Sequence, residues 1–146
     1  MALVPELSLY LAGDIYAVWE QTEAAAGRGE LPPPFWSVAW PGGQALARYV
    51  LDHRELVAGR TFVDYGSGSG LAALAAAMAG AAVVTAVEPD PLAREAIALN
   101  AAANALPVPV FTTDIPPAGQ TPDVVVAGDV WYDQQLAQVV SAYLGG

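Results

Sequence analysis

The sequence contains no cysteine and only one histidine, His53. Without cysteine, the chain cannot form disulfides, use a thiol nucleophile, or bind zinc or iron–sulfur clusters through thiolates. A lone histidine also disfavours a Ser-His-Asp triad and a histidine-rich metal site. The residue types therefore predict a function that needs no metal.

Lysine is absent as well, and basic residues are scarce. Five arginines stand against 15 acidic residues, which gives a net charge of −10 and a pI near 4.1. Binding nucleic acid requires lysine and arginine to neutralise phosphates, so we expect no nucleic-acid partner. An acidic surface favours a basic partner, such as an exposed lysine of another protein, although solubility alone explains most of this charge.

Long apolar runs are also missing. The chain is 55% hydrophobic with a mean hydropathy of +0.39, yet no run reaches the roughly 18–20 residues of a membrane span. Residues 1–6 carry no basic segment of the kind that opens a secretory signal. We therefore expect a cytoplasmic chain with no membrane partner. Its 146 residues suit one domain.

The central feature is a glycine-rich turn between a strand and a helix. A strand from Thr61 is expected to end at Asp64-Tyr-Gly-Ser-Gly-Ser-Gly70, and a helix to run from about Leu71 to Ala79. The glycines remove Cβ atoms where a ligand comes close, and the first N–H groups of the helix can receive a negative group. A bare strand–helix connection is the alternative.

The glycine spacing separates two ligand classes. A dinucleotide fingerprint is G-x-G-x-x-G, whereas this turn is G-x-G-x-G and follows an acidic residue, Asp64. A carboxylate beside the helix N-terminus disfavours a pyrophosphate. It suits a ligand that carries both an amino group and a carboxylate.

More acidic residues follow the later strands. A strand at Ala82–Val87 ends at Glu88, about 20 residues beyond the glycine turn, where a carboxylate can accept hydrogen bonds from ribose. The strand Val108–Thr112 precedes Asp114, which is either a turn residue or a contact for adenine. After the apolar strand Asp123–Ala127, Asp129 and Tyr132 are expected in the crevice beyond the strand ends.

Helices are expected between and around these strands, at Ile15–Ala26, Gln44–His53, Pro91–Asn104 and Gln134–Leu144. The pattern predicts that the second of them buries Leu46, Tyr49 and Val50. It predicts that the third buries Leu92, Ala96, Leu99 and Ala103.

Two tryptophans, Trp36 and Trp40, lie in a proline- and glycine-rich segment between the first two helices. They form either a hydrophobic clamp on the sheet or an aromatic lid over a ligand pocket.

Four segments together resemble one family: Trp36-x-x-x-Trp40-Pro-Gly-Gly-Gln-Ala-Leu-Ala47, Asp64-Tyr-Gly-Ser-Gly-Ser-Gly70, Asn100-Ala-Ala-Ala-Asn104 and Gly128-Asp-Val-Trp-Tyr132. The glycine turn resembles motif I of class I S-adenosylmethionine-dependent methyltransferases. The full set is similar to the electron transfer flavoprotein β-subunit lysine methyltransferases and to the ribosomal protein L11 methyltransferases. The likeness runs from about Pro5 to Leu144.

The resemblance implies an α/β fold with a Rossmann-like, doubly wound, mainly parallel sheet. It implies an N-terminal arm and helix over residues 1–30, then a domain over residues 31–146 that binds S-adenosylmethionine. The implied catalytic residues are Asp129 and Tyr132. The implied cofactor contacts are Trp40, Asp64, Gly66, Ser67, Gly68, Gly70, Glu88, Asp114 and Asp129.

The resemblance further implies methyl transfer to a lysine of a protein, by analogy the electron transfer flavoprotein β subunit or a ribosomal protein, with S-adenosylhomocysteine as product. Methylation of a small molecule is an alternative. The strand order would stop at 3-2-1-4, without the last strands of the full fold, which leaves the fourth strand as an open edge. A second copy of the chain could cover that edge as a homodimer, and a truncated, inactive cofactor-binding module is the remaining alternative.

Overall fold

The computed structural model describes residues 3–113, 121–131 and 134–144. Tyr132 and Asp114 lie outside these ranges. The elements in chain order are α1 (Ile15–Ala26), η1 (Phe35–Ser37), α2 (Pro41–Asp52), η2 (Arg54–Leu56), β1 (Thr61–Tyr65), α3 (Leu71–Met78), β2 (Val83–Val87), α4 (Pro91–Ala103), β3 (Val110–Thr112), β4 (Val124–Ala127) and α5 (Gln134–Leu144).

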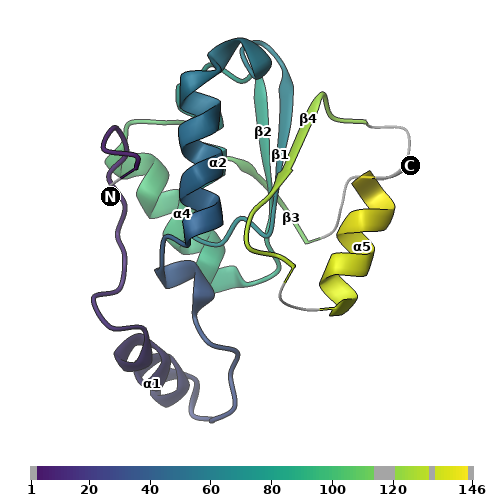
Figure 1. The fold of residues 1–146 in the computed structure, drawn as a ribbon. Coiled ribbons are helices and arrows are strands. Elements are labelled where there is room, and N and C mark those ends of the chain that lie inside the picture. The colour runs from purple at the N-terminus through teal and green to yellow at the C-terminus, as the bar shows by residue number, and fades with distance from the viewer. Residues whose placement is uncertain (1–2, 114–120, 132–133, 145–146) are drawn as a thin grey trace.

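The described strands form one parallel sheet in the order β3-β2-β1-β4 (Figure 1). This confirms the expected α/β class and strand order. Parallel strands end at the same edge of a sheet. The glycine turn after β1, Glu88 after β2 and Asp129 after β4 therefore emerge along one edge.

Hydrogen bonds at the amino ends of β1 and β4, opposite the ends that carry the acidic residues, hold the register of these two strands. The Asp123 Oδ2 atom accepts hydrogen bonds of 2.8 Å from both the backbone N–H and the hydroxyl of Thr61, and the Asp123 N–H donates to Thr61 Oγ1 at 2.9 Å. These bonds from Thr61 hold the pKa of the Asp123 carboxyl below its usual value. These hydrogen bonds place Phe62 opposite Val124 and therefore Tyr65 opposite Ala127, so β1 and β4 end side by side.

The core lies between the sheet and the helices α2 and α3. Phe62 and Leu74 are its largest fully buried side chains in this region, exposed by 1% and 0%. In α3, Ala73, Ala75 and Ala76 have no exposed surface, and small side chains allow α2 and β1 to pack closely on that helix. An alanine-rich helix is thus the centre of the core and holds the glycine turn at its N-terminus.

Helix α2 begins at Pro41, three residues earlier than the sequence indicated. Trp40 is the extended N-cap, and Pro41 suits the first helical position because its φ is already fixed. The buried face was also predicted wrongly in part. Tyr49 is 55% exposed, whereas Ala47 and Leu51 are buried beside Val50.

The predicted buried face of α4 was right for Ala96 only. Leu92 and Leu99 are 45% and 58% exposed, and the buried side of the helix carries Ala93, Ala96, Ile97, Asn100 and Ala101. Alanine occurs on both sides of this helix, so the hydrophobic pattern does not distinguish them. A fully buried asparagine is therefore part of the packing face of α4.

The outer side of β4 has no partner strand among the described residues. All four of its residues are only partly buried, unlike those of a central strand covered on both faces. Helix α5 lies on the β4 side of the molecule (Figure 1), and its Val140 is 1% exposed.

The N-terminal segment contributes to the same core. Val4 and Leu7 are 0% and 3% exposed and belong to the cluster around Phe62 and Leu74. Helix α1, capped by Asp14, buries none of its side chains and stands apart from the sheet in Figure 1. Within the described residues, the helices are too short or too polar to cross a membrane.

Candidate functional site

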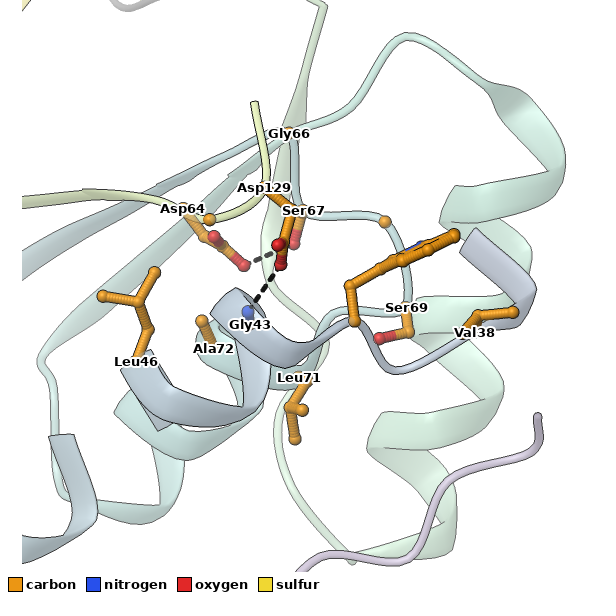
Figure 2. Close-up of a pocket in the computed structure, with 13 residues that line it drawn as sticks. Val38, Gly43, Leu46, Asp64, Gly66, Ser67, Ser69, Leu71, Ala72 and Asp129 are labelled. Carbon is orange, nitrogen blue, oxygen red and sulfur yellow. Dashed lines mark hydrogen bonds between the residues drawn. The ribbon is translucent and has the colours of Figure 1, made fainter. Parts of the chain in front are cut away.

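A small pocket of about 50 Å³ lies at the carboxyl ends of β1 and β4 (Figure 2). It is formed by the glycine turn, the start of α2, the start of α3 and the residues after β4. Its lining consists of Val38, Trp40, Gly43, Leu46, Asp64, Gly66, Ser67, Gly68, Ser69, Leu71, Ala72, Gly128 and Asp129. Six of the residues that the sequence assigned to the site thus meet in one place: Trp40, Asp64, Gly66, Ser67, Gly68 and Asp129.

Asp64 is the buried acid of this pocket, at 3% exposure. Its Oδ2 atom accepts hydrogen bonds from Ser67 Oγ at 2.7 Å and from the Ala73 N–H at 3.1 Å. Burial raises the pKa of the Asp64 carboxyl to about 6, against the lowering effect of those two bonds. The chain's own carboxylate thus occupies one of the free N–H groups at the start of α3.

The three glycines of the turn have different roles. All three adopt positive φ angles, which favours glycine at each position. A Cβ on Gly66 would lie 2.9 Å from Val130 Cγ1, and one on Gly70 would lie 2.9 Å from Ile97. Only Gly68 has room for a Cβ, which would make ordinary van der Waals contact with Trp36 Cα at 3.8 Å and with the Gly66 carbonyl oxygen at 3.9 Å.

Gly70 therefore makes room for α4 and does not line the pocket. Its predicted contact with a cofactor stays a prediction. Gly66 and Gly68 do line the pocket, so the part of the turn that can face a ligand is residues 66–69.

Glu88 lies next to the turn but outside the pocket lining. Its Oε2 atom accepts from the Gly68 N–H at 2.9 Å, and its Oε1 atom accepts from the Asp90 N–H at 3.0 Å. Burial raises the pKa of the Glu88 carboxyl, against the effect of these bonds. Each carboxylate oxygen can accept a further hydrogen bond, so the group remains able to hold a hydroxyl.

Asp129 closes the pocket from the β4 side and also caps α2. Its Oδ2 atom accepts from the Gly43 N–H at 2.9 Å, an otherwise unpaired donor in the first turn of the helix (Figure 2). The backbone at Asp129 has φ of +54°, an unusual value for a residue other than glycine. The tight turn and the helix cap together hold this carboxylate at the pocket.

Close packing around Asp129 requires two glycines. A Cβ on Gly42 would lie 2.6 Å from Asp129 Oδ2, and one on Gly128 would lie 3.1 Å from the Gly43 nitrogen. The segment around Gly42 and the segment around Gly128 were both singled out in the sequence, but the sequence pattern does not predict that the two are in contact. Their contact joins the start of α2 to the end of β4.

The two tryptophans of the proline-rich segment separate. Trp40 lines the pocket, is 40% exposed, and donates from Nε1 to the Phe35 carbonyl at 2.8 Å. Trp36 instead lines a second groove, formed by residues 9–12, Val18 and Ser37. The lid interpretation stays a prediction, and Trp40 is the tryptophan that lines the pocket beside Asp64 and Asp129.

The predicted roles of Asp114 and Tyr132 fall on residues outside the described ranges. The described residues contain no group of three or more His, Asp or Glu side chains placed to hold a metal. Sequence reasoning missed four apolar residues that line the pocket: Val38, Leu46, Leu71 and Ala72. Val38 and Leu46 lie within the quoted segment Trp36–Ala47, and Leu71 and Ala72 directly follow the glycine turn, so their positions in the sequence are the signal that could have found them.

The raised pKa of Asp64 predicts a pH-dependent stability. Between the ordinary value of 3.8 and about 6, the folded state keeps a proton that the unfolded state releases. The contribution of this group to stability is therefore present below pH 4 and is lost as the pH rises through 6. We expect the free energy of unfolding of Asp64→Asn, minus that of the parent, to increase by about 2 kcal/mol between pH 4 and pH 7.

Urea unfolding of both proteins at several pH values measures this difference. Taking the difference cancels carboxyls that do not interact with Asp64, such as Asp123 with its lowered pKa. Glu88 cancels only in part, because its charge contributes to the raised pKa of Asp64. A difference that stays constant with pH would contradict the titration of Asp64.

Comparisons with known proteins found related methyltransferases. The family model for ribosomal protein L11 methyltransferase (PrmA) matches residues 44–130, from the start of α2 to the residue after Asp129. The electron transfer flavoprotein β-subunit lysine methyltransferase of Rattus norvegicus is 40% identical over 98% of this chain and 56% of its own length. A ribosomal protein L11 methyltransferase of Bordetella parapertussis is 34% identical over 85% of this chain and 36% of its own.

A solved structure of similar fold is a 16S rRNA methyltransferase of T. thermophilus in complex with AdoMet and guanosine. It has a TM-score of 0.51 and 26% sequence identity, over 60% of this chain and 25% of that protein. This chain spans about half the length of the curated lysine methyltransferases that it matches.

Proposed function

Because this chain belongs to the ribosomal protein L11 methyltransferase (PrmA) family of S-adenosylmethionine-dependent methyltransferases, we propose that it methylates a lysine side chain of a protein. The observation that carries this proposal is the pair of carboxylates, Asp64 and Asp129, in one small pocket beside the glycine turn. Two carboxylates suit two positively charged groups. One is the amino group of the cofactor, and the other is the amine that receives the methyl group.

The pocket fits one end of the cofactor. A whole ligand of that size needs a cleft of several hundred Å³, so a pocket of about 50 Å³ suits the amino-acid end only. We propose that the nucleoside lies beyond the partly exposed Gly68, beside the Glu88 carboxylate that accepts from the Gly68 N–H. In this proposal Asp64 holds the ammonium group of the cofactor, and residues 66–69 line the rest of its amino-acid portion. Glu88 accepts hydrogen bonds from the hydroxyls of its ribose.

When bound, S-adenosylmethionine supplies a methyl group that a sulfonium already activates, so the protein's task is alignment and charge stabilisation. The target amine must lose a proton to solvent before it can bond to the methyl carbon. Asp129 then holds the amine and stabilises the positive charge that forms on its nitrogen. The exposed face of Trp40 can shield the site and attract that cation.

The acceptor that we propose is a basic protein segment with an exposed lysine. A net charge of −10 attracts such a segment. The electron transfer flavoprotein β subunit is the first candidate, because the Rattus norvegicus methyltransferase named for it matches 98% of this chain, against 85% for the Bordetella parapertussis ribosomal protein L11 methyltransferase. A ribosomal protein is the second candidate.

Thermal and chemical unfolding in the presence of S-adenosylhomocysteine tests whether the protein binds this class of cofactor. At about 100 times its dissociation constant, a ligand adds about 2.7 kcal/mol to the free energy of unfolding. We expect that gain with S-adenosylhomocysteine and none with NADH. A folded protein that responds to neither ligand would contradict the proposal.

Transfer of a labelled methyl group to protein extracts then tests the reaction. Label on lysine in protein supports the proposal, and label on small molecules alone contradicts it. Binding without any transfer would instead favour the cofactor-binding module as the function of this chain.

A further inference from the structure

Helix α4 carries a fully buried asparagine that the site described so far does not use. Asn100 has no exposed surface and lies among Ala96, Ile97 and Ala101. Burying an amide is unfavourable unless its hydrogen bonds are satisfied. Its partners therefore indicate why a polar side chain occupies this position.

Asn100 joins two segments that are far apart in the sequence. Its Oδ1 atom accepts from the Tyr10 N–H at 2.7 Å, and its Nδ2 atom donates to the Ser69 carbonyl at 2.9 Å. Tyr10 belongs to the N-terminal arm, and Ser69 lies in the glycine turn and lines the pocket. One side chain thus connects the arm to the surface proposed to hold the cofactor.

The next asparagine on the same face, Asn104, is hydrogen-bonded to the arm but, in the described part of the chain, not to the glycine turn. Asn104 accepts from the Ser8 N–H at 2.9 Å and donates to the Ser8 carbonyl at 2.7 Å. It also donates to the backbone carbonyl of Asn100 at 2.7 Å, and it makes no hydrogen bond with the glycine turn among the described residues. The two asparagines therefore offer a matched comparison.

We propose that Asn100 is a positioning residue that couples the N-terminal arm to the glycine turn. The bond from Tyr10 orients the Asn100 amide so that it can donate to the Ser69 carbonyl, and the bond to Ser69 orients it to accept from Tyr10. Loss of the bond to the arm should therefore weaken the bond to the turn. The conformation of the turn depends on three glycines with positive φ angles. Other hydrogen bonds also restrain the turn, such as those from the Gly66 N–H to the Val87 carbonyl and from the Gly68 N–H to Glu88, and Asn100 adds the restraint on the Ser69 carbonyl. The arm thereby influences cofactor affinity without contacting the cofactor.

A variant at the arm tests the coupling without altering Asn100. Tyr10→Pro removes the N–H that Asn100 accepts, in a segment with no helix or strand, and Tyr10→Ala keeps that N–H. The Tyr10 side chain is 66% exposed, so its loss alone has little effect on folding. We expect faster amide exchange at Gly70, whose N–H is bonded to the Ser67 carbonyl at 2.8 Å, in Tyr10→Pro but not in Tyr10→Ala.

Asn100→Ala should accelerate exchange at both Tyr10 and Gly70. Asn104→Ala frees the arm only at Ser8 and leaves the Tyr10 N–H bonded to Asn100, so it should accelerate exchange at Gly70 less than Asn100→Ala does. These measurements need no ligand, so they test the coupling even if the proposed function is wrong. Unchanged exchange at Gly70 in both Tyr10→Pro and Asn100→Ala would overturn the inference.

The effect on affinity depends on the proposed function. Titration calorimetry should show S-adenosylhomocysteine binding about fivefold to tenfold more weakly to Tyr10→Pro than to Tyr10→Ala. A core variant such as Val84→Ala lowers stability but should leave affinity unchanged, because Val84 does not line the pocket. Equal affinities in the two Tyr10 variants, both still folded, would also overturn the inference.

Discussion

Replacing Asp129 with asparagine should lower the rate of methyl transfer about 10²–10³-fold while leaving the free energy of unfolding nearly unchanged. The asparagine oxygen can still accept from the Gly43 N–H, as Asp129 Oδ2 does at 2.9 Å. Asparagine also tolerates the positive φ of +54° at this position better than most residues. The variant therefore removes the negative charge from the pocket and keeps the cap of α2.

Labelled methyl transfer gives the rate, and titration with S-adenosylhomocysteine gives the affinity, which should weaken by no more than about tenfold. Glu95→Gln is a suitable control, because it removes one negative charge from an exposed position on α4. If Asp129→Asn transferred methyl groups at the parent rate, the role of Asp129 at the amine would be wrong. Asp129→Ala is less informative, since it also removes the cap.

Replacing Gly42 with alanine should lower methyl transfer about 100-fold through the position of the Asp129 carboxylate. The new Cβ would lie 2.6 Å from Asp129 Oδ2, so the carboxylate must rotate away from the Gly43 N–H. Loss of that charged hydrogen bond exceeds the gain from placing alanine in a helix. We expect a net loss of about 1 kcal/mol in the free energy of unfolding.

Gly43→Ala is the matched control for stability, because a Cβ at the next position of the same helix has no neighbour within 4 Å. That variant should gain about 0.5 kcal/mol from helix propensity. Urea unfolding measures both variants. Equal stability changes in the two would contradict a specific contact between Gly42 and Asp129.

The order of the elements could be predicted because its causes are local. Alternating breakers and apolar runs delimit β1, α3 and β2, and Pro91 marks the start of α4. Once a parallel sheet is expected, the acids that follow each strand must gather at one edge. Together with the family resemblance, this rule places Asp64 and Asp129 in one crevice, and the two residues do line the same pocket.

The faces of the helices could not be predicted with the same success. In α4 the pattern favoured Leu92 and Leu99, but the side that packs inward is the one that bears Ile97 and Asn100. Alanine on every side of a helix leaves its hydrophobic direction undefined. Which face of α4 packs inward then depends on which side chains fit closely against the neighbouring elements.

The sequence by itself determined the fold class, the family and the edge of the sheet where the site lies, because strands, turns and glycine spacing are encoded in short stretches. Only the tertiary structure decided what each glycine does and what holds each acid. Gly70 accommodates Ile97, Asp129 is bound by a residue 86 positions away, and Asn100 reaches one 90 positions away. Such contacts arise when distant segments pack together, so no local pattern in the chain contains them.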